Sequence, residues 1–180
     1  MSMVSILVSA SGEDRPGIVA TVTRVLYQMG GNLEDSAMTR LGGAFAVLVI
    51  ARIEADRVAA LEEAFASVDG LSIQVKTLSE AESRPPSASG GSPYIISLYG
   101  ADKPGIVYRV AALLEQLQVN ITDVVTHCSS SDGRSPLYLL VFEVDLPAAA
   151  DAAGFKESMA SLARELQVEI TVNRMETVEL

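Results

Sequence analysis

The sequence predicts an α+β protein that consists of two copies of one β-α-β-β-α-β unit. The first observation is a motif that occurs twice: DRPGIV begins at Asp14, and DKPGIV begins 102 − 14 = 88 residues later, at Asp102. The second is that Asn32 and Asp35 recur at the same offset, as Asn120 and Asp123. The third is that strand-like and helix-like apolar patterns follow each other in the same order in both halves. A constant offset over such a length indicates an internal repeat.

The first half begins with apolar residues that alternate from Met3 to Ala10, which is typical of a strand. After a short loop, Asp14 is expected to cap a helix in which Pro16 takes a first-turn position. Helical spacing of apolar residues continues to about Met29, where Gly30-Gly31 ends the helix. The remaining elements are expected as a strand at Asn32–Thr39, a strand at Phe45–Ile53, a helix marked by Val58, Leu61, Phe65 and Val68, and a strand marked by Leu71, Ile73 and Val75.

The second half repeats this order. It is expected to contain a strand at Tyr94–Tyr99, a helix marked by Ile106 to Leu117, strands at Asn120–His127 and Tyr138–Leu146, a helix marked by Phe155 to Leu166, and a last strand marked by Val168 to Val172. The order β-α-β-β-α-β is that of the ferredoxin-like split unit. We therefore expect two antiparallel sheets, each with its helices on one face.

Between the halves, residues 79–93 have no apolar periodicity and are rich in Ser, Pro, Gly and Glu. This composition predicts a flexible linker between a first domain at 1–78 and a second domain at 94–180. The second hairpin is 93 − 88 = 5 residues longer than the first, because Phe45 aligns with Tyr138. The extra residues fall between Cys128 and Pro136, so the two copies need not carry equivalent sites.

Composition argues against several classes of protein. The net charge is −10, neither half is basic and Lys and Arg do not cluster, which disfavours direct binding to nucleic acid. No apolar run approaches the roughly 18 residues of a membrane span, and the start of the chain does not resemble a secretion signal. A single cysteine, Cys128, excludes an internal disulfide and fits a reducing cytoplasm.

The only histidine, His127, is next to Cys128. A metal site would need more soft ligands than these two, and neighbours on a strand point to opposite faces, which disfavours a nucleophile–base pair. We expect neither catalysis nor a cofactor.

The repeated loop has the chemistry of a small anion site. The first turn of a helix leaves N–H groups unpaired at the positive end of the helix dipole, and Gly17 or Gly105 lets a ligand approach the backbone. Such a site suits a carboxylate. The oxygens of Asp14, Asn32 and Asp35, or of Asp102, Asn120 and Asp123, could accept hydrogen bonds from an ammonium group. Together these groups describe a site for an α-amino acid.

A purely structural interpretation of the same residues stays open. Asp, Pro and Gly are ordinary residues for starting a helix that packs on a sheet. Asn32 and Asn120 could simply shape the turn after the helix, since Asn tolerates left-handed backbone geometry.

The complete pattern resembles the ACT domain family. The resemblance rests on DRPGIV, GGNLEDS and GGAFAVL in the first half and on GADKPGIV, VNITDV and VDLP in the second. Domains of this family typically bind amino acids where two domains pair. The resemblance implies ligand-binding residues Asp14, Pro16, Gly17, Ile18, Asn32 and Asp35 in the first copy, and Asp102, Pro104, Gly105, Ile106, Asn120 and Asp123 in the second.

A tandem pair without a catalytic domain is similar to members of the family that restrain a separate DNA-binding transcription activator. The resemblance therefore implies a non-catalytic regulator that binds an amino acid, with glycine as the expected ligand and a protein partner in place of DNA. The alternative is a detached regulatory subunit of an enzyme of amino-acid metabolism. A small enzyme is disfavoured because no catalytic cluster is evident. Sheet edges usually avoid exposure by pairing, so we expect the halves to pack side by side or the chain to form a homodimer, with ligand near the junction.

Overall fold

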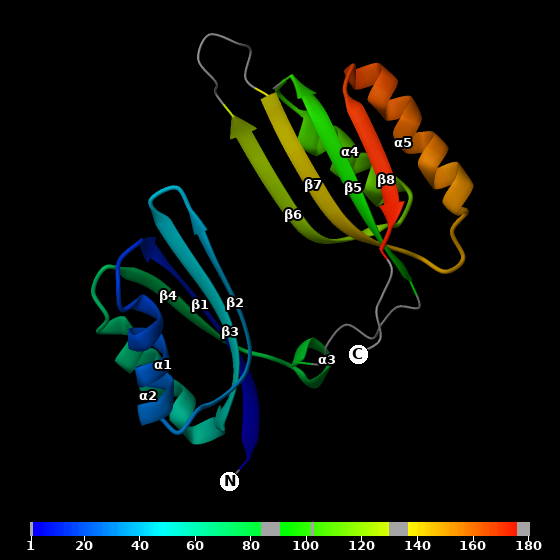
Figure 1. Ribbon diagram of the computed structural model, residues 1–180. Helices are drawn as coiled ribbons and strands as arrows, with labels where there is room; N and C mark the ends of the chain where they lie inside the picture. Colours follow the sequence, from blue (N-terminus) through cyan, green and yellow to red (C-terminus); the bar gives the residue numbers. More distant parts are fainter. Residues whose placement is uncertain (1, 84–90, 102, 130–136, 176–180) are drawn as a thin grey trace. The chain divides into compact units, whose positions relative to one another are not determined.

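The structure is a computed structural model that describes residues 2–83, 91–101, 103–129 and 137–175. It divides into two compact units, residues 1–85 and 86–180. Each unit is a four-stranded antiparallel sheet with helices against it (Figure 1). The predicted fold class, two ferredoxin-like units in tandem, is confirmed.

Unit 1 contains β1 (Met3–Glu13), α1 (Ile18–Gln28), β2 (Asn32–Leu41), β3 (Ala44–Glu54), the short helical turn η1 (Ala55–Arg57), α2 (Val58–Ala66), β4 (Leu71–Thr77) and α3 (Glu80–Ser83). The strand order in its sheet is β2-β3-β1-β4. Apolar side chains alternate along β1 and β3, and those on one face meet the apolar sides of α1 and α2. The result is a core of twelve buried residues, with Ile6, Val8, Ile53 and Leu61 among them.

All ten residues of β2 are exposed. This strand lies at the edge of the sheet, and neither α1 nor α2 buries its side chains. Because these side chains stay exposed to solvent, the sequence of β2 can be less apolar than that of the other strands.

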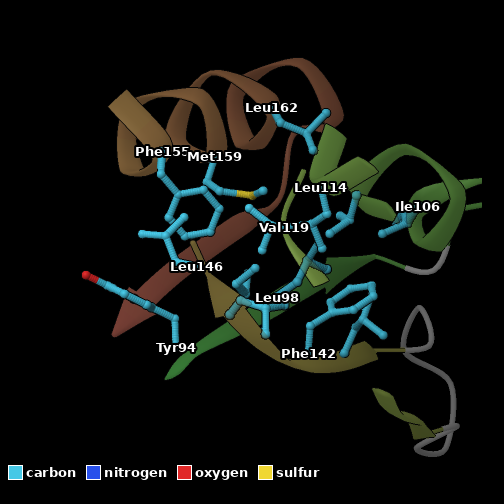
Figure 2. Packing of buried hydrophobic residues seen from close by; sticks show 14 residues of the cluster. Tyr94, Leu98, Ile106, Leu114, Val119, Phe142, Leu146, Phe155, Met159 and Leu162 are labelled. Carbon is cyan, nitrogen blue, oxygen red and sulfur yellow. The ribbon is translucent and has the colours of Figure 1, made fainter. Parts of the chain in front are cut away.

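Unit 2 contains β5 (Ser92–Ala101), α4 (Ile106–Gln116), β6 (Asn120–Ser129), β7 (Leu137–Leu146), α5 (Ala152–Leu166) and β8 (Glu169–Arg174), with strand order β6-β7-β5-β8. Figure 2 shows its core, in which Leu114, Phe155, Met159 and Leu162 from the two helices meet side chains of β5 and β7. The rings of Tyr94 and Phe155 pack edge to face, with centroids 5.9 Å apart.

Part of the segment expected to be a linker is regular. Glu80–Ser83 form one helical turn, and β5 begins at Ser92, two residues before its predicted start. The sequence Ser79-x-x-Glu82 is a capping box: the Glu82 carboxylate accepts from the Ser79 backbone N–H at 3.0 Å, and the Ser79 hydroxyl accepts from the Glu82 N–H at 3.3 Å. Residues 84–90 of the predicted linker, and 130–136 of the longer hairpin, lie outside the described residues.

A lysine on β4 holds this turn beside the sheet. Lys76 Nζ lies 2.5 Å from the Glu82 carboxylate. The hydrogen bond from Lys76, together with those from Ser79, lowers the pKa of Glu82 from 4.5 to about 2.

Candidate functional site

The loop between β1 and α1 has the geometry of an anion site, but glycine, and not the aspartate, stands at the start of the helix. Gly17 is the N-cap of α1, with φ 94° and ψ −2°, and no side chain caps the helix. The first intrahelical bond runs from Thr21 N–H to the Gly17 carbonyl at 2.9 Å. The N–H groups of residues 18–20 therefore have no acceptor within the helix. A Cβ added to Gly17 would meet nothing within 4 Å, so the space beside these donors is open.

The expected helix-capping roles of Asp14 and Pro16 are wrong. Asp14 lies three residues before the N-cap, and its backbone N–H donates to the Gly43 carbonyl at 2.8 Å. Its carboxylate faces Arg40 at 3.5 Å. Asp14 is thus joined to the β2–β3 hairpin, while Pro16 lies in the turn before the helix, which begins at Ile18. The left-handed glycine supplies the chain reversal that a capping aspartate would otherwise shape.

The loop between β5 and α4 repeats this geometry. Gly105 is the N-cap of α4, with φ 89° and ψ 0°, and Arg109 N–H donates to its carbonyl at 2.9 Å. Pro104 lies in the preceding turn, and Ile106 is buried as the first residue of the helix, as Ile18 is in unit 1. The predicted site residue Asp102 lies outside the described residues.

A basic residue in each loop has a structural role that the sequence reasoning did not assign. The Arg15 guanidinium donates to the Asp69 carbonyl at 2.9 Å, in the turn between α2 and β4. At the equivalent place, Lys103 Nζ donates to the Leu166 carbonyl at 3.0 Å, at the end of α5. Both side chains tie the loop to the end of the second helix of their unit. The sequence does contain a sign of this role, because both copies of the motif have a basic residue at this position.

The predicted acceptors Asn32 and Asp35 do not lie near the loop of their own unit. Asn32 stands opposite Arg52, which stands opposite Ser5, near the beginning of β1, whereas the loop follows Glu13 at its end. The eight residue steps from Ser5 to Glu13 correspond to roughly 26 Å at 3.3 Å per residue. Asp35, opposite Ile50, is two steps closer. One small ligand therefore cannot contact the loop and these two side chains within a single unit.

Unit 2 shows the same separation. Asn120 stands opposite Asp145, and Asp145 stands opposite Pro93, again eight residues from the end of β5 at Ala101. The alternative interpretation, in which the asparagines adopt left-handed geometry, is also wrong. In the described chain the positive φ angles at these turns belong to Gly30 and to its equivalent Gln118 (30 + 88 = 118).

The two loops share a geometry that suits an anion, with open backbone donors at the positive end of a helix. No group of three or more His, Cys, Asp or Glu side chains within these ranges could hold a metal ion. None of the helices in the described part of the chain is long and apolar enough to cross a membrane. Each loop instead presents backbone N–H groups at a helix start beside an open glycine, which suits a carboxylate.

Comparison with known proteins gives the same family for both halves. The ACT domain family model matches residues 5–76 and 92–173. The glycine cleavage system transcriptional repressor of Escherichia coli (strain K12) is 28% identical over 173 residues, which cover 93% of this chain and 88% of the repressor.

Two solved structures have a similar fold over nearly the whole chain. A protein of unknown function from Galdieria sulphuraria has a TM-score of 0.79 and 25% identity, covering 97% of this chain and all of that one. A putative glycine cleavage system transcriptional repressor has a TM-score of 0.70 and 18% identity, covering 98% of this chain and all of that one.

Proposed function

The chain belongs to the ACT domain family, and from this premise we propose that it is a non-catalytic regulatory protein that senses an amino acid and controls transcription through a protein partner. Glycine is the first candidate ligand, since the relative from Escherichia coli is a repressor of the glycine cleavage system. The partner that this proposal requires is a DNA-binding activator. The net charge of −10 supports action through a protein in place of direct DNA binding.

The observation that carries the proposal is the shared geometry of the two loops. Gly17 and Gly105 are both N-caps in left-handed conformation, and for both the space where a side chain would stand is open. A loop needed only to start a helix could use a serine or aspartate cap, which supplies an acceptor of its own. Leaving the first-turn N–H groups without a side-chain acceptor in both units keeps them available for a ligand carboxylate.

The ammonium group of the ligand needs acceptors that the same loop supplies only in part. Asp14 is close by in sequence, but its carboxylate faces Arg40. Asn32 and Asp35, with their equivalents Asn120 and Asp123, lie at the far end of their own sheets. In our proposal these residues therefore reach a loop-bound ligand from another ACT domain, which is either the other unit of the same chain or a unit of a second copy.

Thermal unfolding against a panel of the twenty amino acids tests the proposal. A ligand that binds only the folded protein raises the free energy of unfolding by about 2.7 kcal/mol at a hundredfold excess over its Kd. We expect glycine to give a selective increase in Tm that is reduced in Asn32→Ala or Asn120→Ala. Affinity capture from cells should then recover a DNA-binding protein, with a yield that changes when the ligand is added. Absence of any shift across the panel contradicts amino-acid sensing, and recovery of a biosynthetic enzyme favours the alternative of a detached regulatory subunit.

A further inference from the structure

The register of the first sheet places Arg40, near the end of β2, beside the loop between β1 and α1. Arg40 stands opposite Phe45 on β3, and Phe45 stands opposite Gly12 on β1. The Phe45 side chain packs against the core of unit 1, and residues directly opposite each other in a sheet point to the same face. Arg40 therefore lies on the side of the sheet that carries the helices, at the end of β1 where the loop begins.

The contact between Arg40 and Asp14 is a loose ion pair. Arg40 Nη1 lies 3.5 Å from Asp14 Oδ2, and the two side chains are 72% and 31% exposed. In the described part of the chain Arg40 makes no other ion pair or hydrogen bond. An exposed pair of this kind contributes little to stability, so Arg40 can leave Asp14 at little cost. The backbone stays in place, because the Asp14 N–H donates to the Gly43 carbonyl and joins the loop to the β2–β3 hairpin (Figure 1).

The neighbouring charges of the loop do not compete for these two side chains. Glu13 stands opposite Ala44, in the next row of the sheet, so its side chain points to the other face. The Arg15 guanidinium is bound to the Asp69 carbonyl. One guanidinium and one carboxylate therefore stand beside the loop that carries the open N–H groups. An α-amino acid has the opposite charges, a carboxylate and an ammonium group, and arginine binds a carboxylate through two parallel N–H groups.

Unit 2 repeats the loop but not the arginine. Cys128 takes the place of Arg40 (40 + 88 = 128), since it stands opposite Tyr138, which stands opposite Gly100. Neither β6 nor β7 contains a lysine or an arginine. Lys103, in the loop itself, donates to the Leu166 carbonyl at the end of α5. The two copies of the motif thus have the same backbone geometry but differ in the charge beside it.

We propose that Asp14 and Arg40 bind the two charged groups of an α-amino acid in unit 1. The ligand replaces the ion pair: its ammonium group donates to the Asp14 carboxylate, and its carboxylate accepts from the Arg40 guanidinium beside the first-turn N–H groups of α1. This inference rests on the proposed sensing of an amino acid and adds a specificity to it. Unit 1 is the tighter of the two sites, and it requires both charges of the ligand.

NMR titration of the full chain, followed at the amides of residues 18–20 and 106–108, tests each unit separately. The probe is glycine or, if glycine gives no shift, the amino acid that raises Tm most in the panel. In the wild type, residues 18–20 should saturate at the lower concentration. Arg40→Cys gives unit 1 the residue of unit 2 and should raise the Kd at residues 18–20 about tenfold or more, with no change at residues 106–108. Arg24→Cys, at an exposed position of α1, is the matched control and should change neither Kd.

Acetate, which has a carboxylate and no ammonium group, separates ligand binding from a purely structural contact. Asp14→Asn removes the partner of Arg40. It should therefore weaken binding of the amino acid but strengthen binding of acetate at residues 18–20, whereas Arg40→Cys should weaken both. If Arg40 only held Asp14 in place, loss of either side chain would break the same contact, and both variants would change acetate binding in the same direction.

Three results would overturn the inference. If folded Arg40→Cys binds the amino acid at residues 18–20 as tightly as the wild type, Arg40 is not part of the site, while the proposed sensing stands. If Asp14→Asn weakens acetate binding as Arg40→Cys does, the ion pair has a structural role alone. If residues 106–108 respond to an amino acid and residues 18–20 do not, the ligand belongs to unit 2. A wild type that responds at neither helix start contradicts the proposed function as well.

Discussion

The left-handed glycine that starts each first helix gives the sharpest prediction about the loops. Gly17 has φ 94°, and a Cβ at this position would meet no atom within 4 Å. Gly17→Ala therefore introduces no clash, and its effect on stability comes from backbone conformation alone. The variant isolates the cost of the geometry that leaves the first-turn N–H groups open.

Two opposing effects determine how far Gly17→Ala changes the free energy of unfolding. Left-handed geometry costs an L-residue about 1–2 kcal/mol. Alanine also restricts the unfolded chain, which stabilises the fold by about 0.4–1 kcal/mol relative to glycine. The net effect is a decrease of about 1 kcal/mol in the free energy of unfolding, or about 4–8 °C in Tm for a unit of this size.

Urea denaturation and calorimetry measure this difference, and Gly43→Ala is the matched control. A Cβ at Gly43 also meets nothing within 4 Å, but this glycine is not among the residues with positive φ. Its alanine variant should be as stable as the wild type or slightly more stable. If the two variants have the same free energy of unfolding, the left-handed N-cap does not constrain the loop and does not hold the first-turn N–H groups open.

The other predictions concern the tie between loop and helix, the linker turn and the core. Arg15→Ala should lower the free energy of unfolding by about 1 kcal/mol, since it removes a charge-assisted hydrogen bond to the Asp69 carbonyl at an exposed site. Arg15→Lys should retain most of the stability, and equal losses for the two variants in urea denaturation would contradict this. Because its folded-state pKa is lowered to about 2, Glu82 stabilises the linker turn above pH 4.5, and this contribution is lost as the pH falls toward 2. Carbon-detected NMR titration should show a midpoint near 2 that moves toward 4.5 in Lys76→Ala, and a wild-type midpoint near 4.5 would refute the contact. Phe142→Ala should cost about 3–5 kcal/mol in denaturation experiments, because this buried ring leaves a cavity in the core of unit 2; a loss below 1 kcal/mol would mean that the core is packed differently.

Most of the fold could be predicted from the sequence because apolar periodicity and the repeat give the same answer. The predicted strand at Asn32–Thr39 and the one at Phe45–Ile53 correspond to β2 (Asn32–Leu41) and β3 (Ala44–Glu54). The differences lie at the ends of elements. Helix α1 begins at Ile18, later than the predicted start at Asp14 and Pro16, because a glycine in left-handed conformation can occupy the N-cap without a side-chain acceptor.

The arrangement of the predicted site could not be inferred from spacing along the chain. Asn32 follows the loop closely in sequence, but the eleven residues of α1 carry the chain to the other end of the sheet. At 1.5 Å per residue that helix alone spans about 16 Å. The role of Arg15 depends on a turn more than fifty residues away, which only the folded sheet brings close.

An NMR titration with glycine, observed at the backbone amides, tests the central claim most directly. We predict saturable chemical-shift changes at the first-turn amides of α1 or α4, at residues 18–20 or 106–108, and their loss at residues 18–20 in Gly17→Ala. Changes of this kind with another amino acid would keep the site and replace the ligand. A folded protein whose amides at both helix starts respond to none of the twenty amino acids would contradict the claim that these loops bind an amino acid.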